Sequence, residues 1–383
     1  MDFSWTEAQL ALRAEMVELG RARLSEGAQE RDRDGAFSRD AWSACAETGV
    51  MGLAMPKAYG GAEHDILTAM IAMEGLGYGC RDNGLLLGLN AHIWTASMPI
   101  NEFGTEAQKQ RYLPGLIDGS SIAAHCNTEP DAGSDGHALT TRAEPTDDGY
   151  VLNGRKSYIT LGPVADVFVV FAMTRPERGK WGISAFIVDR DTPGFTIGPT
   201  RSKMGLRSVP FSELSFDDCH VPASALLGKE GAGTAVSTAT LEWDRCCILS
   251  CHVGAMERQL EEAVAYAKKR EQFGQRIGKF QAVSHRLADM KLNIEAARLL
   301  LYRVGWLKQE GKSAALAGTL AKLFVSEAFV DNSLSAIRTQ GGRGYLTETE
   351  VERDLRDAVG GILYAGTSDI QRNIIARFLG LPA

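Results

Sequence analysis

The spacing of apolar residues changes twice along the chain, and this change constrains the fold more than any other feature of the sequence. Before about residue 119 apolar side chains recur at helical intervals, whereas between about 120 and 227 they alternate between frequent Gly, Pro, Asp and Thr. Helical spacing then returns. We predict an α+β protein with an all-helical N-terminal domain (1–119), a middle antiparallel β domain that is a barrel or a sandwich (120–229), and a C-terminal four-helix bundle (230–383).

The same spacing locates individual elements. Thr105 precedes the last helix of the first domain and has Gln108 three residues later, which is a capping-box spacing. The predicted strands include residues 167–172, 182–188 and 211–216. The predicted helices cover residues 6–24, 40–48, 65–117 (in three pieces), 234–268, 277–309, 314–337, 348–359 and 367–378.

The bulk composition excludes several classes of function. The chain has 383 residues and a net charge of -7, so it offers no basic field for a nucleic acid or an anionic membrane. Its seven cysteines are odd in number and contain no C-x-x-C pair, which disfavours a metal site or a disulfide framework. The N-terminus is acidic and amphipathic, and no apolar run of about 18 residues occurs. We therefore expect a cytoplasmic protein with no metal and no membrane span.

One polar stretch, Ala123–Gly136, is dense in turn-forming residues and follows an apolar run. A loop of small residues lets backbone N–H groups and hydroxyls approach a ligand closely. A second polar stretch, Asn153–Thr160, follows it. The two stretches read as neighbouring edges of one β domain, where they would form a cradle for a flat, phosphate-bearing cofactor. The alternative is that Ala123–Gly136 is only a surface turn between strands.

Six motifs in order resemble the flavin-dependent acyl-CoA dehydrogenase family, and they span most of the chain. They are TEPDAGSD (128–135), KSYIT (156–160), REQFG (270–274), GGRGY (341–345), RDA (356–358) and GTSDIQR (366–372). The resemblance implies an enzyme that binds FAD. In this family the α-hydrogen of an acyl thioester leaves as a proton and the β-hydrogen leaves as a hydride to flavin N5, which yields a trans-2,3-enoyl thioester.

The resemblance also implies roles for individual residues. Thr128 would contact the flavin ring, Ser134 would lie near the FAD pyrophosphate or the substrate pantetheine, Tyr158 would stack beside the isoalloxazine, and Thr160 would donate to flavin N5. Cys126 and Gly133 would complete that side of the FAD site, and Thr367 and Asp369 would close over its adenosine side. The residues that would reach the FAD of a neighbouring subunit are Arg270, Phe273, Gln281, Arg338 and Gly342.

The family resemblance is weakest at the catalytic base. Many members carry Glu directly before the C-terminal Gly-Thr, but here that position is Ala365, which has no proton acceptor. Some relatives, including carrier-protein dehydrogenases of secondary metabolism, instead carry the base before an Arg on the first long C-terminal helix. Asp244 occupies that position here, and Arg245 would orient the thioester arm. Glu242 is the competing candidate for the base and otherwise a substrate contact, and because it lies about 200° from Asp244 around a helix, both cannot face one substrate.

The leading hypothesis is therefore FAD-dependent α,β-dehydrogenation of an acyl thioester held on CoA or on a phosphopantetheinyl carrier protein, with the carrier protein favoured. Electrons would pass to an electron-transfer flavoprotein or to oxygen. Because part of each FAD site would come from a neighbour, we expect a homo-oligomer, with a dimer as the minimum and a tetramer as the family-like state. The alternatives are a flavin monooxygenase or nitrososynthase on the same fold, which would lack a base at both positions, and a scaffold without turnover. His125, Asn127 and Arg338 depart from the commonest family residues.

Overall fold

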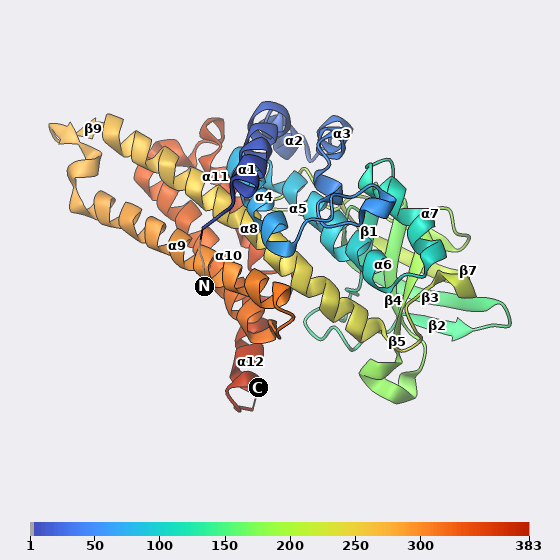
Figure 1. The fold of residues 1–383 in the computed structure, drawn as a ribbon. Coiled ribbons are helices and arrows are strands. Elements are labelled where there is room, and N and C mark those ends of the chain that lie inside the picture. Colours follow the sequence, from blue (N-terminus) through green and yellow to red (C-terminus); the bar gives the residue numbers. More distant parts are fainter. Residues whose placement is uncertain (1–3, 383) are drawn as a thin grey trace.

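The structure is a computed structural model that describes residues 4–382. Within helix α8 it describes every side chain except those of Leu241, Glu242 and Asp244. It confirms the α+β class, with helices, then strands, then helices along the chain (Figure 1).

The N-terminal part is all helical, and its cap signals form as predicted. Thr105 caps α7 together with Gln108, and both hydrogen bonds of the capping box are present. Thr6 and Gln9 form a second capping box at α1, which the sequence analysis did not identify. Almost every residue of α4 is buried because this helix packs against both α1 and α8. The helices are α1 (Glu7–Leu19), α2 (Ala28–Asp34), α3 (Arg39–Glu47), α4 (Ile66–Gly79), α5 (Asn83–Asn90), α6 (Met98–Phe103) and α7 (Glu106–Ile117).

The middle part is one eight-stranded sheet in the order β6-β7-β3-β2-β4-β5-β8, with β1 also paired to β4. All seven residues of β4 are buried, so this strand forms the centre of the β core. The strands are β1 (Ala123–Cys126), β2 (Arg142–Pro145), β3 (Gly149–Thr160), β4 (Val167–Met173), β5 (Ile183–Asp189), β6 (Phe195–Ile197), β7 (Phe211–Pro222) and β8 (Leu226–Leu227).

The prediction of an antiparallel β domain needs one correction. Strand β4 pairs in parallel with β1, from Ala123 against Val167 to Cys126 against Val170, and in parallel with β2 at one position. Parallel strands require a long connection, and residues 127–166 supply it here by running through β2 and β3 before the chain returns. The remaining pairings of the sheet are antiparallel.

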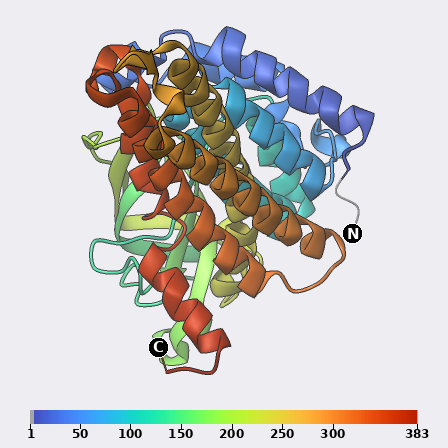
Figure 2. The same ribbon diagram turned by 90° about the vertical axis from the view of Figure 1, so that its left-hand side faces the viewer.

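The C-terminal part is built around α8, whose 37 residues make it about 55 Å long. One end of α8 lies beside the sheet and the other ends at a small hairpin at the far end of the molecule (Figure 1). Figure 2 shows the orange and brown C-terminal helices in front of the blue N-terminal helices and the green strands. The elements are α8 (Gly233–Lys269), β9 (Glu271–Gln272), β10 (Gln275–Arg276), α9 (Gln281–Gln309), α10 (Ala315–Gln340), α11 (Val351–Gly361) and α12 (Ser368–Phe378).

A buried polar cluster joins the three parts. Asn83 at the start of α5 donates to Asp354 and Asp357 of α11, at 2.9 and 3.1 Å. Asp357 also accepts from the backbone N–H of Leu206, which belongs to the β part. Burial raises the pKa of Asp357 to about 7. These contacts fix α5 and the β part relative to the C-terminal helices, and so they fix the walls of the pocket between these parts.

None of the helices in residues 4–382 combines the length and the apolar character needed to cross a membrane.

Candidate active site

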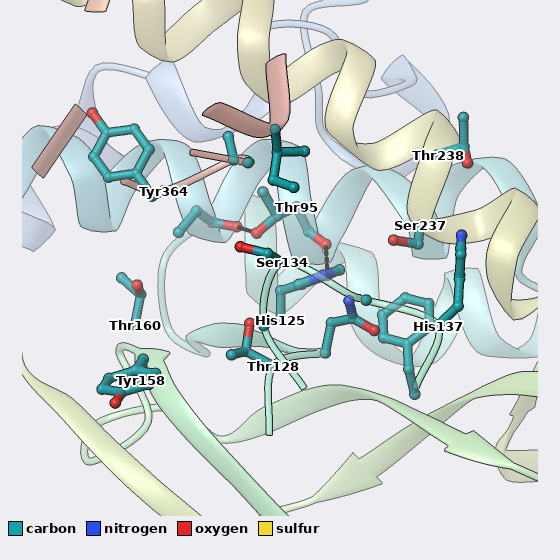
Figure 3. A pocket seen from close by; sticks show the side chains of 18 of the residues that line it. Thr95, His125, Thr128, Ser134, His137, Tyr158, Thr160, Ser237, Thr238 and Tyr364 are labelled. Carbon is teal, nitrogen blue, oxygen red and sulfur yellow. Dashed lines mark hydrogen bonds between the residues drawn. The ribbon is translucent and has the colours of Figure 1, made fainter. Parts of the chain in front are cut away.

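A pocket of about 430 Å³ lies where the three parts of the chain meet. The loop after β1 and the end of β3 form one wall, the first three turns of α8 form another, and α5 with the segment after it forms the third (Figure 3). The loop before α12 closes the pocket on the side of Tyr364. The two stretches predicted to form a cradle do line one pocket, since Thr128, Ser134 and Tyr158 are all among its lining residues.

The loop after β1 is held in place by a buried ion pair. Lys156 of β3 donates to the Glu129 carboxylate at 2.8 Å and to the Asn127 carbonyl at 3.1 Å, and both charged side chains are almost fully buried. Glu129 also accepts from the backbone N–H groups of Thr140 and Thr141. Burial alone would raise the pKa of Glu129, but Lys156 and these donors lower it to about 2. The pair fixes both ends of the loop against the sheet.

The backbone of β3 turns Tyr158 outward. The register between β3 and β7 shifts between Lys156 and Ile159, which is a β-bulge, and Tyr158 has a positive φ of 59° there. Its side chain is 70% exposed although it sits in a strand. The backbone N–H of Ser157 donates to the Thr128 carbonyl at 2.9 Å, which joins the two predicted segments directly. A bulge at this point re-aims a side chain toward a ligand site.

The loop before α12 is tied to α8 through Arg245. The Arg245 guanidinium donates to the Ala365 carbonyl at 3.2 Å, and Gln371 donates to the carbonyls of both Ala365 and Gly366. Ala365 and Gly366 both have positive φ, 53° and 89°. Thr367 then caps α12 by accepting from the backbone N–H of Ile370. Arg245 thus lies in the pocket and also shapes the loop that carries alanine in place of the common glutamate.

Tyr364, in the same loop, is anchored at its hydroxyl. The oxygen lies 2.8 Å from Nε2 of His252, a buried residue of α8 that stacks on Phe329. Burial, with a smaller contribution from Lys322, lowers the pKa of His252 to about 3, so the imidazole is neutral. Its Nδ1 has no hydrogen-bond partner among the described residues, which favours the proton on Nε2 because a buried orphan N–H is costly. His252 therefore donates to Tyr364 and fixes its ring at the pocket wall.

His125, at the end of β1, also lines the pocket. Its Nδ1 lies 3.0 Å from the Thr95 carbonyl, so Nδ1 must carry the proton and Nε2 is an acceptor in the neutral ring. Burial lowers the pKa of His125 to about 4, which keeps the ring neutral at ordinary pH. In the sequence, His125 stands out only as a departure from the commonest family residue. Its one sequence signal was its position three residues before Thr128.

The structure places several predicted residues in the pocket and others elsewhere. Cys126 has a fully buried thiol, which donates weakly to the Ala124 carbonyl and is not among the described pocket-lining side chains. The side chains of Asp244 and Glu242 lie outside the described residues. Thr367 and Asp369 lie at the start of α12, next to the pocket-lining Gly366 and Ile370. The predicted residues that do line the pocket are Thr128, Gly133, Ser134, Tyr158, Thr160 and Arg245.

A third group of predicted residues is exposed and lies in the C-terminal helical part. Phe273, with 93% of its surface exposed, sits at the β9–β10 hairpin at the far end of the bundle from the sheet (Figure 1). The structure does not bring this group to the pocket of its own chain. Its members are Arg270, Phe273, Gln281, Arg338 and Gly342.

The residues in the pocket fit FAD. Gly133 and Ser134 are exposed in a loop without bulky side chains, so backbone N–H groups can approach a phosphate or a ring edge. Thr128 and Thr160 bring hydroxyl groups to the β wall. Tyr158 offers an exposed aromatic ring beside them. This set of hydroxyls, backbone donors and one aromatic face suits the polar edge and the flat face of a flavin.

Three family models match the chain in order. Those described as acyl-CoA dehydrogenase N-terminal, middle and C-terminal domains match residues 6–120, 124–219 and 231–380.

Three similar proteins cover the chain almost completely. An L-prolyl-[peptidyl-carrier protein] dehydrogenase of Pseudomonas fluorescens Pf-5 is 42% identical over 382 residues, which are 100% of each chain. A crystal structure of the prolyl acyl carrier protein oxidase AnaB is 47% identical with a TM-score of 0.97, and covers 99% of this chain and 100% of its own. A structure of PigA with FAD and proline is 39% identical, with a TM-score of 0.97 and full coverage of both chains.

Proposed function

This chain belongs to the acyl-CoA dehydrogenase family and is an FAD-dependent oxidoreductase of acyl thioesters, and we propose that the acyl group it oxidises is L-proline held on a peptidyl carrier protein. The observation that carries the proposal is the 42% identity, over the full length of both chains, to a relative with that named activity. Two solved structures whose titles name a prolyl carrier-protein oxidase, or a complex with FAD and proline, support it.

The chemistry of the pocket also supports a prolyl group. A prolyl ring differs from an all-carbon ring of the same size by one nitrogen, which carries N–H and needs a hydrogen-bond acceptor when it is taken out of water. His125 is a neutral imidazole whose Nε2 is an acceptor, and it lines the pocket together with the apolar side chains of Leu87, Ala91 and Phe171. We propose that His125 accepts from the ring nitrogen and selects prolyl over an all-carbon ring.

The cofactor and the chain divide the work. When bound, FAD supplies the acceptor for the β-hydrogen as a hydride. We propose that Thr128, Ser134, Tyr158 and Thr160 hold it against the β wall. Arg245 orients the thioester arm while its guanidinium holds the loop at Ala365.

We propose that Asp244 takes the α-proton. Around α8 the pocket-lining residues extend from Gly233 to Thr238, an arc of about 140° at about 100° per residue. On the same count Asp244 falls inside this arc, about 20° from Gly233, and Glu242 falls about 40° beyond its far edge. Helical register therefore favours Asp244 over Glu242, and neighbouring Arg245 does line the pocket.

The substrate proposal is tested with thioesters that differ in one feature. The FAD-loaded protein is mixed anaerobically with L-prolyl carrier protein, with cyclopentanecarbonyl carrier protein and with butyryl-CoA, and loss of the flavin absorbance is followed. We expect L-prolyl carrier protein to react with the highest kcat/KM. The cyclopentane analogue has the same ring without nitrogen, and we expect it to react about 10²-fold or more slowly because the acceptor would be left unpaired. Equal rates for the two rings, or a preference for butyryl-CoA, would contradict the proposal.

We also propose that the active unit is at least a dimer. Phe273 and Gly274 form the two-residue turn between β9 and β10, and Phe273 has a φ of 52°, a strained value for a bulky residue. A bulky aromatic that is both strained and 93% exposed points to a contact outside its own chain. We infer that it meets the FAD of a partner subunit.

Replacing Phe273 with alanine should therefore weaken FAD retention without unfolding the chain. We expect a FAD Kd raised about tenfold, together with a shift toward smaller species in sedimentation, because the aromatic contact across the interface is lost. Leu10→Ala is a matched control, since Leu10 is also a large exposed apolar residue but lies on α1 rather than at the hairpin. Unchanged FAD affinity in Phe273→Ala would refute the shared site.

The electron acceptor and the compartment stay predictions. We propose that an electron-transfer flavoprotein or oxygen accepts the electrons, and turnover assays with each acceptor distinguish them. All seven cysteines are free and buried in the structure. Free thiols agree with a reducing compartment such as the cytoplasm.

A further inference from the structure

The segment Pro176–Gly182, which we call the mouth segment, borders the pocket beside the start of α8. The Thr234 hydroxyl, which lines the pocket, donates to the Lys180 carbonyl at 2.7 Å. Ile183, directly after the segment, also lines the pocket. His137 and Thr238, both exposed, also line the pocket and lie on the right-hand side of Figure 3.

The mouth segment is held firmly at its base. Arg175 makes a bidentate pair with Glu230, at 3.0 and 2.8 Å. The Thr174 hydroxyl donates to the Gly182 carbonyl at 3.0 Å. A Cβ at Gly231 would come within 2.6 Å of the Trp181 carbonyl, so the glycine allows the segment to pack closely against the chain leading into α8. The segment therefore presents its side chains from a fixed platform.

Those side chains are an unusual set for a free surface. Trp181 is 60% exposed, and the Lys180 ammonium lies 5.1 Å from the centre of its ring. Arg178 and Lys180 are exposed, and neither makes an ion pair with a described side chain, although Arg178 lies close enough to Glu230 to help lower its pKa. Exposed Trp with neighbouring Arg is the composition found at the energetic centres of protein interfaces.

We propose that the mouth segment is the surface on which an acidic carrier protein docks, which rests on the carrier-protein substrate proposed above. A carrier delivers its acyl group on a phosphopantetheine arm, so its body must sit within one arm length of the open end of the pocket. The arm begins at a phosphate, so an anion must lie near this mouth. Although the whole chain has a net charge of -7, Arg178 and Lys180 place two exposed cations beside this part of the pocket, where they would attract an acidic partner. Trp181 would supply an apolar contact with the carrier protein.

The test separates docking from chemistry. Arg178→Glu/Lys180→Glu is compared with Lys57→Glu/Lys109→Glu, which makes the same change in net charge on the N-terminal helical part. Each FAD-loaded protein is assayed with L-prolyl carrier protein and with L-prolyl-pantetheine, which has the arm but no protein. Binding is measured in parallel by titrating each protein with a carrier protein whose phosphopantetheine arm holds a prolyl analogue that cannot be oxidised.

We expect the mouth variant to raise the KM for prolyl carrier protein and the Kd of the loaded carrier about tenfold or more. Its kcat and its KM for prolyl-pantetheine should not change. Trp181→Ala should act in the same direction, and added salt should weaken carrier binding to the wild type more than to the mouth variant. The control variant should match the wild type.

The remaining outcomes distinguish failure of the substrate proposal from failure of the docking proposal. Wild type that does not oxidise prolyl carrier protein would overturn the substrate proposal itself. Wild type that does so, with a mouth variant equal to the control, would overturn the docking surface alone. Equal losses on carrier protein and on pantetheine would show that the segment acts on the pocket rather than on the partner, and would also overturn the docking proposal.

Discussion

Replacing Asp244 with asparagine should slow anaerobic bleaching of the flavin by L-prolyl thioester about 10²–10⁴-fold while FAD stays bound. The reason is that a carboxamide of nearly the same shape cannot accept the α-proton, and hydride transfer cannot proceed while that proton stays. Ala365 cannot substitute, because an alanine side chain has no acceptor. The rate is measured by stopped-flow absorbance, and FAD content is measured from the spectrum of the purified variant.

Glu242→Gln serves as the matched control for this prediction. It removes the other carboxylate of the same helix, two residues away, and positions 242 and 244 lie about 200° apart around a helix, so both cannot face one substrate. We expect its bleaching rate to stay within about tenfold of the wild type. If Asp244→Asn bleached normally and Glu242→Gln did not, the two carboxylates would exchange roles. A normal rate in both variants would move the proton acceptor off α8.

Replacing Lys156 with methionine should destabilise the protein by about 3–5 kcal/mol, because it leaves the Glu129 carboxylate buried without its cation. The lost contacts are the 2.8 Å ion pair and the bond to the Asn127 carbonyl. The loop that carries Thr128 and Ser134 would lose its attachment to β3, so FAD should also be lost. Urea unfolding measures the first effect and flavin absorbance the second.

The control for this prediction is Lys229→Met, the same substitution at an exposed lysine near the end of the β part. We expect that change to stay within about 0.5 kcal/mol. The pH dependence gives a second check. Because the folded pKa of Glu129 is lowered to about 2, its contribution is present above the unfolded pKa near 4.5 and is lost as pH falls toward 2. A cost for Lys156→Met no larger than the control would contradict the role assigned to the pair.

Much of the fold and part of the site could be predicted from the sequence, and the residues explain why. The change of hydrophobic period located the three parts, since period depends only on which face each element buries. The cap at Thr105 is a local signal, and it formed as predicted. The parallel pairing of β1 with β4 was missed because strand direction depends on a path of about forty residues that no local pattern records.

Site residues that belong to motifs could be predicted from the sequence, whereas features that depend on packing between distant segments could not. Thr128, Tyr158 and Thr160 came from motifs and do line the pocket. The bulge that turns Tyr158 outward and the burial that keeps His125 and His252 neutral both arise from contacts between distant segments. Trp181 and its neighbouring cations belong to none of the motifs, and only the structure shows that their segment contacts Thr234 at the pocket.

We propose above all that a carboxylate on α8 removes the proton next to the thioester. The most direct measurement is a crystal structure of the protein with FAD and a non-oxidisable L-prolyl-pantetheine mimic. The distance from an Asp244 carboxylate oxygen to the prolyl Cα should be about 3–3.5 Å, and no other proton acceptor should be closer. An Asp244 carboxylate far from that carbon, with His125 Nε2 or another acceptor against it, would contradict this mechanism.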